Sequence, residues 1–307
     1  MKLEFPDPFH RNGIWLRGNL HTHSTASDGT RTPQEIVDLY SSKGYDFLSI
    51  TDHGRVTNPS HLDPKNLVLI PGQEISLGRS IAGTNFHIVG IGLQNTIPMR
   101  DSDVNGDPQL AIEKIKSCGG VAILAHPYWS GLNYCDMMSL TGYDGVEIYN
   151  SNCEIYNGAG DSRPHVDGIL AGGRHVNIFT TDDHHGLPEP LKPLDAAISW
   201  ISVKAEKSTS EAVLSSIKCG FFYGSNGPEI KEVRLEDNII TAKTSPVRSI
   251  GFIASPSLGS KFWADRTTIS EASYAVRKGE IYVRVEATDE KGRTAWSNPI
   301  YISQEMT

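Results

Sequence analysis

Between residue 14 and about residue 225, the apolar positions alternate between helical spacing and short continuous runs. In "RTPQEIVDLYSSKGYDFLSITDH", residues 31–53, Ile36, Leu39 and Tyr40 give a helix one apolar face, and "DFLSIT" follows as a buried strand. The same plan recurs in "PQLAIEKIKSCGGVAILAHP" and in "VDGILAGGRHVNIFTTDDHHG". Alternation of this kind predicts an α/β fold in which helices cover parallel strands.

Two of the predicted helices carry a start signal. Thr32 precedes Pro33, and Glu35 completes a capping box, so a helix is expected to begin there. In "STSEAVLSSIKCG", residues 208–220, Ser208 and Glu211 have the same spacing and predict a second capping box.

The pattern changes after "GFFYGSNGPEI". Short alternating segments such as "IKEVRL", "SIGFIAS" and "EIYVRVEAT" are separated by turn residues, which predicts a small antiparallel β-sandwich. The boundary is placed near Gly227, giving one domain over 1–227 and another over 228–307. The second domain either shapes the mouth of the first or serves as a stabilising or oligomerising appendage.

Composition narrows the classes of partner. The 307 residues carry a net charge of -8, which argues against a duplex nucleic-acid partner but leaves room for a local basic cleft. The four cysteines form no C-x-x-C pair, so we expect reduced thiols in a cytoplasmic protein. The sequence has no run of 18 apolar residues, so no membrane span is expected. The first residues do not resemble a signal peptide.

Histidines and carboxylates gather where predicted strands end. In a parallel α/β barrel these ends open on one face, so residues far apart in the sequence converge there. A mixture of imidazoles and carboxylates suits zinc, manganese or iron, and two such ions can share a hydroxide for hydrolysis. The sequence has no G-x-S-x-G elbow and no P-loop, so a serine hydrolase and an NTPase have no support. The residues concerned are His21, His23, Asp28, Asp52, His53, Glu74, His87, His126, Glu147, Asp182, Asp183, His184 and His185.

Over about residues 14–225 the chain resembles the PHP (polymerase and histidinol phosphatase) superfamily. The matching motifs are "HTHS", "SDG", "TDH", "IPGQE", the histidine of "FHIVG", "AHP" and an Asp-x-His-Gly. The resemblance implies a distorted (β/α)7 barrel with two or three divalent metal ions at the strand ends. "VEIYN", "TDDHHG" and "GFFYGSNGP" are most similar to the subgroup that includes carbaryl hydrolases.

The resemblance also implies a ligand set. It assigns His21, His23, Glu74 and Asp183 to a first ion, Glu74, His87 and His126 to a second, and Asp28, His53 and His185 to a third. Asp-x-His fits both Asp182 with His184 and Asp183 with His185. We choose the second pair because Gly186 follows it directly, and expect Asp182 and His184 to orient ligands.

The expected activity is metal-dependent hydrolysis. The preferred interpretation is a phosphoesterase that acts on a small phosphorylated molecule. An amide, ester or carbamate hydrolase is the second reading, and a non-catalytic metal-binding or nuclease-accessory module is the third. His53, His185 and Asp183 are the expected catalytic residues, with His53 or His185 protonating the leaving group if the third site were empty. Arg55, Arg163 and Glu147 are candidate substrate residues, although surface or orienting roles stay open for them. Tyr128 and Trp129 either line a pocket or pack. The sequence leaves the oligomeric state open.

Overall fold

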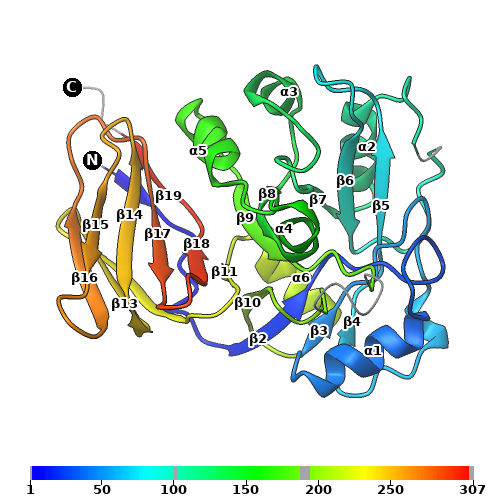
Figure 1. Cartoon of the computed structure of the whole chain (residues 1–307), viewed down its shortest axis with the longest axis horizontal. Helices are drawn as coiled ribbons and strands as arrows, with labels where there is room; N and C mark the ends of the chain where they lie inside the picture. The colour runs from blue at the N-terminus through cyan, green and yellow to red at the C-terminus, as the bar shows by residue number, and fades with distance from the viewer. Residues whose placement is uncertain (1, 100–101, 187–193, 304–307) are drawn as a thin grey trace.

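The chain forms two different parts, one with helices around strands and one built of strands (Figure 1). This computed structural model describes residues 2–99, 102–186 and 194–303. The described helices all end by Lys218, within the region where the sequence predicts alternation. They are α1 (Pro33–Ser42), the 3₁₀ helix η1 (Pro59–His61), α2 (Pro108–Ser117), α3 (Tyr134–Ser139), α4 (Ser151–Asn157), α5 (Arg163–Ala171) and α6 (Ser210–Lys218).

The strands of the first part are only partly parallel. Parallel pairing joins β2 to β3, β3 to β4, β7 to β8 and β8 to β9, whereas β5–β6, β6–β7, β2–β10 and β10–β11 are antiparallel. The expectation of parallel strands throughout is therefore wrong. The bounds are β1 (Lys2–Glu4), β2 (Ile14–Asn19), β3 (Phe47–Leu48), β4 (Val68–Leu69), β5 (Gly72–Leu77), β6 (Phe86–Ile91), β7 (Val121–Leu124), β8 (Gly145–Asn150), β9 (Asn177–Thr181), β10 (Trp200–Ala205) and β11 (Phe222–Ser225).

The β5–β6 hairpin explains one departure from the regular barrel pattern. Residues 78–85 connect the two strands directly, and a loop this short cannot make the crossover that a parallel pair needs. Glu74 consequently lies inside β5, paired with Val89, and not at the end of a strand as expected. Glu74 nevertheless reaches the centre where the other candidate ligands lie, because a β-bridge joins it to His53.

Helix α1 begins directly after the predicted capping residue, whereas helix α6 begins one residue later than predicted. Thr32 and Glu35 form both hydrogen bonds of the predicted capping box at α1. At α6 the cap is Thr209, whose side chain accepts a hydrogen bond from the amide of Ala212. The prediction of Ser208 as the cap is therefore wrong, because the helix begins one residue later than the Ser208–Glu211 spacing implied.

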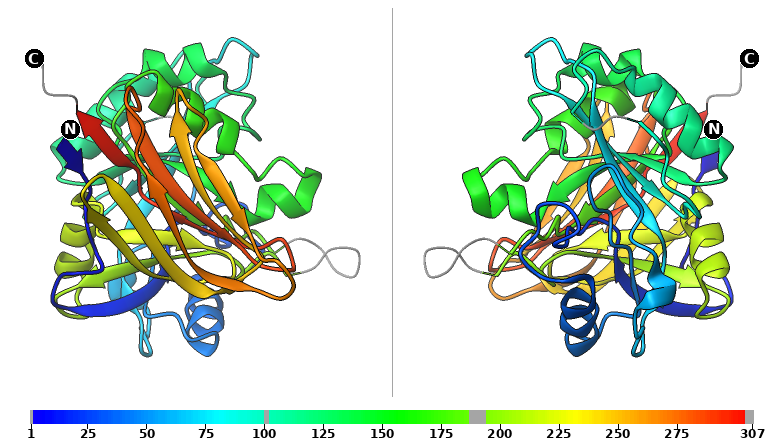
Figure 2. Two further views of the ribbon diagram at one scale, coloured as in Figure 1. Left: turned by 90° about the vertical axis from the view of Figure 1, so that its left-hand side faces the viewer. Right: turned by 90° about the vertical axis from the view of Figure 1, so that its right-hand side faces the viewer.

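The second part is antiparallel, as the alternating segments predict. A three-stranded sheet of β12, β13 and β16 shares a core with the strands around β14 and β17, including Ile240, Phe252 and Val285. Figure 2 shows these strands face on. Their bounds are β12 (Ile230–Glu236), β13 (Ile239–Val247), β14 (Ser249–Ser255), β15 (Ser260–Trp263), β16 (Ile269–Ala275), β17 (Tyr282–Thr288), β18 (Thr294–Ser297) and β19 (Ile300–Ser303).

Hydrogen bonding continues between the two parts. One eleven-stranded sheet includes β2, β10 and β11 and continues through β18 to β17 and β19. The N-terminal strand β1 pairs with β19, so the two described ends of the chain lie side by side (Figure 1). The division at residue 227 thus does not coincide with a break in the sheet, and it stays a prediction.

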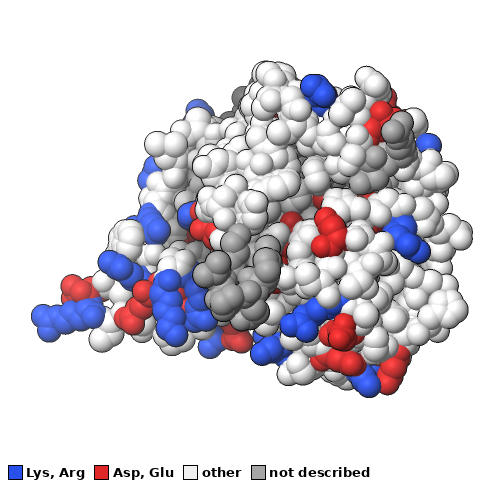
Figure 3. All heavy atoms as spheres, turned by 45° about the vertical axis from the view of Figure 1, so that its right-hand side comes forward, with Lys and Arg blue, Asp and Glu red and all other residues white. Residues whose placement is uncertain are grey.

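The surface carries no single dominant charge on the face of Figure 3. Lysines and arginines lie among acidic side chains along its lower edge, and most of its upper half carries neither. All four cysteines fall within the described ranges and are free, with only Cys153 buried. Among the described helices, none has the length and apolar character needed to cross a membrane.

Candidate metal centre

The predicted ligand segments lie next to each other at one face of the first part. The backbone amide of His23 donates to the carbonyl of His184 at 2.8 Å, and that of Asp183 donates to the carbonyl of His21 at 2.9 Å. A β-bridge joins His53 to Glu74. Backbone pairing therefore places segments 21–23, 53, 74 and 183–185 around one centre.

The first group brings together four buried side chains, His21, His23, Glu74 and Asp183. The Nε2 atoms of His21 and His23 lie 3.1 Å apart. Each lies 3.1 Å from Asp183 Oδ1, and their distances to Glu74 Oε2 are 3.2 and 3.1 Å. All four donor atoms therefore converge on one point.

This spacing fits a shared cation. Ligand atoms held about 2.1 Å from one ion lie about 3.0–3.4 Å from each other in octahedral or tetrahedral geometry. The contact between two imidazole nitrogens also needs a positive charge between them, because their lone pairs otherwise face each other. The residues present thus fit a divalent metal ion.

Glu74 connects this group to a second one. Its Oε2 faces the first group, while its Oε1 lies 2.7 Å from His87 Nδ1 and 3.5 Å from His126 Nε2. His53 Nε2 also lies 3.4 Å from Oε2, so His53, Glu74 and His87 form a compact group. His126 stands slightly outside it, 3.8 Å from Asp183 Oδ2. The two oxygens of this carboxylate therefore face two different sets of imidazole nitrogens.

The third group is more open. Asp28 Oδ2 lies 3.7 Å from His53 Nε2 and 3.5 Å from His185 Nε2, and Asp28 Oδ1 lies 3.4 Å from His23 Nδ1. The side chain of Asp28 is 53% exposed, whereas those of the first group are 5% exposed or less. A cation held here would face the solvent-filled mouth of the site.

Opposite charges at such short range shift the pKa values of the first group. Burial disfavours the charged imidazole of His23, but hydrogen bonds and charge from Asp183 and Glu74 outweigh it and raise its pKa to about 10. Burial likewise opposes charge on Glu74, yet the neighbouring histidines His53 and His21 hold its pKa well below the usual range. In the metal-free protein, protons on the imidazoles thus supply the positive charge that metal ions would otherwise supply.

Metal binding is therefore expected to release protons. A histidine must be neutral to bind a metal, and at pH 7 a group with a pKa near 10 is protonated. Loading the first group should release about one proton or more per protein, and affinity should rise with pH through neutrality. Calorimetric titrations at pH 7 in buffers of different ionisation enthalpy measure this number. Binding without any proton release would contradict the prediction.

Buried partners hold the ligands in place. Glu147, 1% exposed, accepts a hydrogen bond from His21 Nδ1 at 2.7 Å and another from the amide of His126 at 2.9 Å. Asn150 donates from Nδ2 to both Glu147 and Asp183. Of the roles left open for Glu147, the geometry favours orienting His21, because its oxygens face ligands and not the cavity.

The two Asp-x-His pairs point in different directions. Asp183 and His185 face the groups above, whereas Asp182 accepts hydrogen bonds from Tyr40 and three backbone amides of residues 197–199. His184 is fully buried, with Nδ1 2.6 Å from Asp195 Oδ1. This arrangement favours the chosen register. It also places Asp182 in the support of the 197–199 backbone, a more distant role than the ligand orientation expected.

The two candidate arginines lie outside the centre. Arg163 contacts both oxygens of Asp161 through Nε at 2.9 Å, and its Nη1 lies 3.4 Å from Glu286. Glu286 also pairs with the buried Arg284, which binds Asp167. Arg163 thus joins an ion-pair network between α5 and β17. Arg55 is exposed and is not among the described residues that line the cavities. The substrate role of both arginines stays a prediction.

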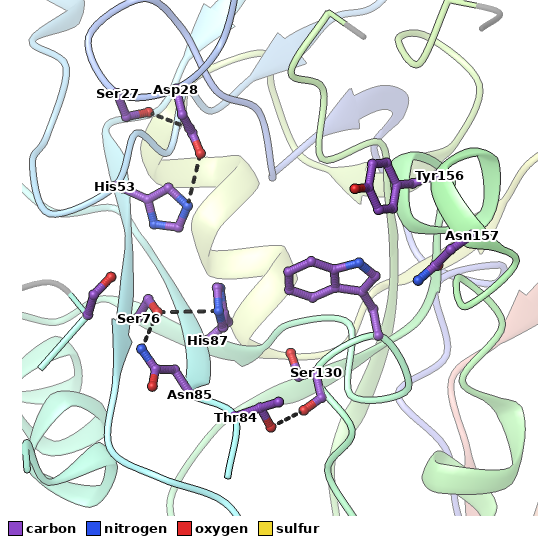
Figure 4. A pocket seen from close by; sticks show the side chains of 12 residues that line it. Ser27, Asp28, His53, Ser76, Thr84, Asn85, His87, Ser130, Tyr156 and Asn157 are labelled. Atoms are coloured by element: carbon purple, nitrogen blue, oxygen red, sulfur yellow. Dashed lines mark hydrogen bonds and ion pairs between the residues drawn. The ribbon is translucent and has the colours of Figure 1, made fainter. Parts of the chain in front are cut away.

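A cavity of about 950 Å³ opens above the centre, next to one of about 350 Å³ that reaches Glu74 and Asp183. Figure 4 shows Asp28 and His53 on one wall and Tyr156 and Asn157, from α4, on the opposite wall. Trp129 lines both cavities, whereas the ring of Tyr128 makes a tilted contact with that of His165. Sequence reasoning did not assign a role to Asn150, at the end of β8, or to Tyr156 and Asn157 in α4. It also grouped Cys153, which lines the smaller cavity, with the other thiols.

Sequence comparison gives several relatives. No family model matches the chain. It is 30% identical over 148 residues to an uncharacterised protein of Methanocaldococcus jannaschii, covering 44% of this chain and 82% of that protein. It is 34% identical over 84 residues to a 5'-3' exoribonuclease of Haemophilus influenzae, and 26% identical over 125 residues to a 3',5'-nucleoside bisphosphate phosphatase of Chromobacterium violaceum. These matches cover 26% and 38% of this chain, and the chain spans only 30% and 43% of the two enzymes.

One solved structure superposes on nearly the whole chain. A two-domain protein of Bacteroides vulgatus, containing a predicted PHP-like metal-dependent phosphoesterase, superposes with a TM-score of 0.51 over 94% of both chains at 16% identity. This likeness concerns the fold alone. The chain therefore belongs to the same family as the Methanocaldococcus jannaschii protein, with the fold of the PHP-like protein of Bacteroides vulgatus.

Proposed function

We propose that this chain is a metal-dependent hydrolase that cleaves a phosphoester of a small molecule. The observation that carries the proposal is Glu74, whose two oxygens face two groups of imidazole nitrogens at the base of one open cavity. The relatives named as an exoribonuclease and as a bisphosphate phosphatase support a phosphoester as the bond. The resemblance of short motifs to carbaryl hydrolases keeps an amide, ester or carbamate bond as the second candidate.

The proposed ligands are the nine residues assigned from the sequence, with zinc, manganese or iron as the ions. When bound, such ions lower the pKa of a coordinated water and stabilise the negative charge that develops on the substrate. The chain's own part is to fix this geometry: Glu147 holds the ring of His21, and Asn150 holds the carboxylate of Asp183. His53 and His185, 20% and 23% exposed, lie where a proton can pass to a leaving oxygen if no ion occupies the third group.

Chelation followed by metal addition tests this function. Protein freed of metal, verified by elemental analysis, should lose hydrolysis of 4-nitrophenyl phosphate, and Mn²⁺ or Zn²⁺ should restore it. Nitrophenyl esters and aryl carbamates are assayed in parallel, because preference for them would move the assignment to the second candidate. Undiminished turnover in the verified metal-free protein would contradict the proposal. Metal binding without hydrolysis of any of the three would favour a non-catalytic module.

A further inference from the structure

Two exposed aromatic rings line the cavity above the candidate metal centre. Trp129 is 41% exposed and Tyr156 is 56% exposed, and both line the large cavity as well as the small one that reaches Glu74. They come from different segments, Trp129 from the turn after β7 and Tyr156 from the last turn of α4. Large apolar surface left open beside a polar centre marks a place where a ligand binds.

The position of Trp129 is fixed relative to the proposed metal ligands. Its ring centroid lies 5.0 Å from that of His126 and 5.8 Å from that of His87, with interplanar angles of 80° and 87°. These edge-to-face contacts hold the indole directly beside the imidazoles. A flat group stacked on the indole would therefore lie next to His87 and His126.

The helix that carries Tyr156 has capping interactions at both ends. The side chain of Asn150 caps α4 by accepting from the amide of Cys153, and Gly158 ends the helix in the left-handed conformation with φ of 75°. Figure 4 shows Tyr156 across the cavity from Asp28 and His53. Aromatic surface from two different segments therefore lines the same cavity.

We propose that Trp129 and Tyr156 form a subsite for a flat aromatic leaving group, so that the substrate class is an aryl phosphate monoester. This inference rests on the proposed phosphoesterase activity. In the reaction, the oxygen of water forms a bond to phosphorus while the bond from phosphorus to the aryl oxygen breaks. The leaving oxygen takes the electron pair and a proton, giving a phenol and inorganic phosphate. The ring stacks on the indole, and its exclusion from water favours aryl over alkyl substrates.

The test compares phenyl phosphate with methyl phosphate in the metal-loaded full chain. The ratio of their kcat/KM values is measured by phosphate release for the wild type and for the variants Trp129→Ala, Trp129→Phe and Tyr156→Ala. Trp263→Ala is the matched control, because Trp263 is a 57% exposed tryptophan on β15 in the other part. We expect the ratio to fall about tenfold in Trp129→Ala, to recover in Trp129→Phe and to stay unchanged in the control.

Binding gives a readout that is independent of turnover. Calorimetry with phenylphosphonate and methylphosphonate, which are not hydrolysed, should show the same loss of ring preference in Trp129→Ala. If no phosphate ester is hydrolysed but phenylphosphonate binding still depends on Trp129, the proposed function fails while the aromatic subsite stands. If hydrolysis is intact and both ratios equal those of the wild type in Trp129→Ala and Tyr156→Ala, the subsite is refuted.

Discussion

Replacing Glu74 by glutamine is expected to lower the hydrolytic activity more than about a thousandfold and to remove bound metal. One oxygen of Glu74 faces His21, His23 and His53, and the other faces His87 and His126. A glutamine has one oxygen and one NH₂ group, so in either orientation an N–H donor points at nitrogen ligands and one group loses its anion. Loss of an orienting partner alone costs about 10–100-fold, and a shared ligand should cost more.

Elemental analysis of the purified variant, combined with kinetics under saturating Mn²⁺ or Zn²⁺, measures both effects. Glu280→Gln is a suitable control, since Glu280 is also a buried carboxylate, 1% exposed, but accepts hydrogen bonds from Ser257 and Tyr274 in the second part. Both variants should show the circular dichroism of the wild type. A Glu74→Gln protein with full metal content and full activity would remove the basis of the bridging assignment.

That these side chains lie around one centre was predictable from the sequence, because short motifs carry them, whereas their role as ligands stays a prediction. His21 and His23 are two residues apart, so in an extended segment their side chains point to the same side. Asp183 follows a buried strand whose end is visible in the apolar pattern. The choice of Asp183 over Asp182 also rested on local information, the glycine after His185. Short-range spacing is the part of a site that sequence patterns describe well.

What escaped prediction depends on contacts far apart along the chain. One partner of Glu147 is His21, 126 residues away, and one partner of Arg163 is Glu286, 123 residues away. The pairing of β1 with β19 joins the two ends of the described chain, although the sequence assigns them to different domains. Strand order and direction depend on such long-range pairing, which the periodicity of a single segment does not encode.

Exchanging each aspartate of the 182–183 pair for asparagine should produce two different failures. For Asp183→Asn we expect loss of the first metal and of activity in a folded protein. Its Oδ1 lies 3.1 Å from the Nε2 atoms of both His21 and His23, and an uncharged amide is a poor ligand beside them. Metal content per folded protein and kcat are the measurements, and the asparagine is nearly the same size, so packing should change little.

For Asp182→Asn we expect loss of stability while the folded protein keeps its metal. The carboxylate accepts hydrogen bonds from Tyr40 at 2.8 Å and from the amides of Ala197, Ile198 and Ser199 at 2.7, 3.1 and 2.7 Å. An amide nitrogen in place of one oxygen would face these donors, which should reduce the free energy of unfolding by roughly 2–4 kcal/mol. Urea titration measures this loss, with Asp183→Asn as the matched comparison. The opposite outcome, in which Asp182→Asn loses metal and Asp183→Asn keeps both metal and activity, would show that the ligand is Asp182.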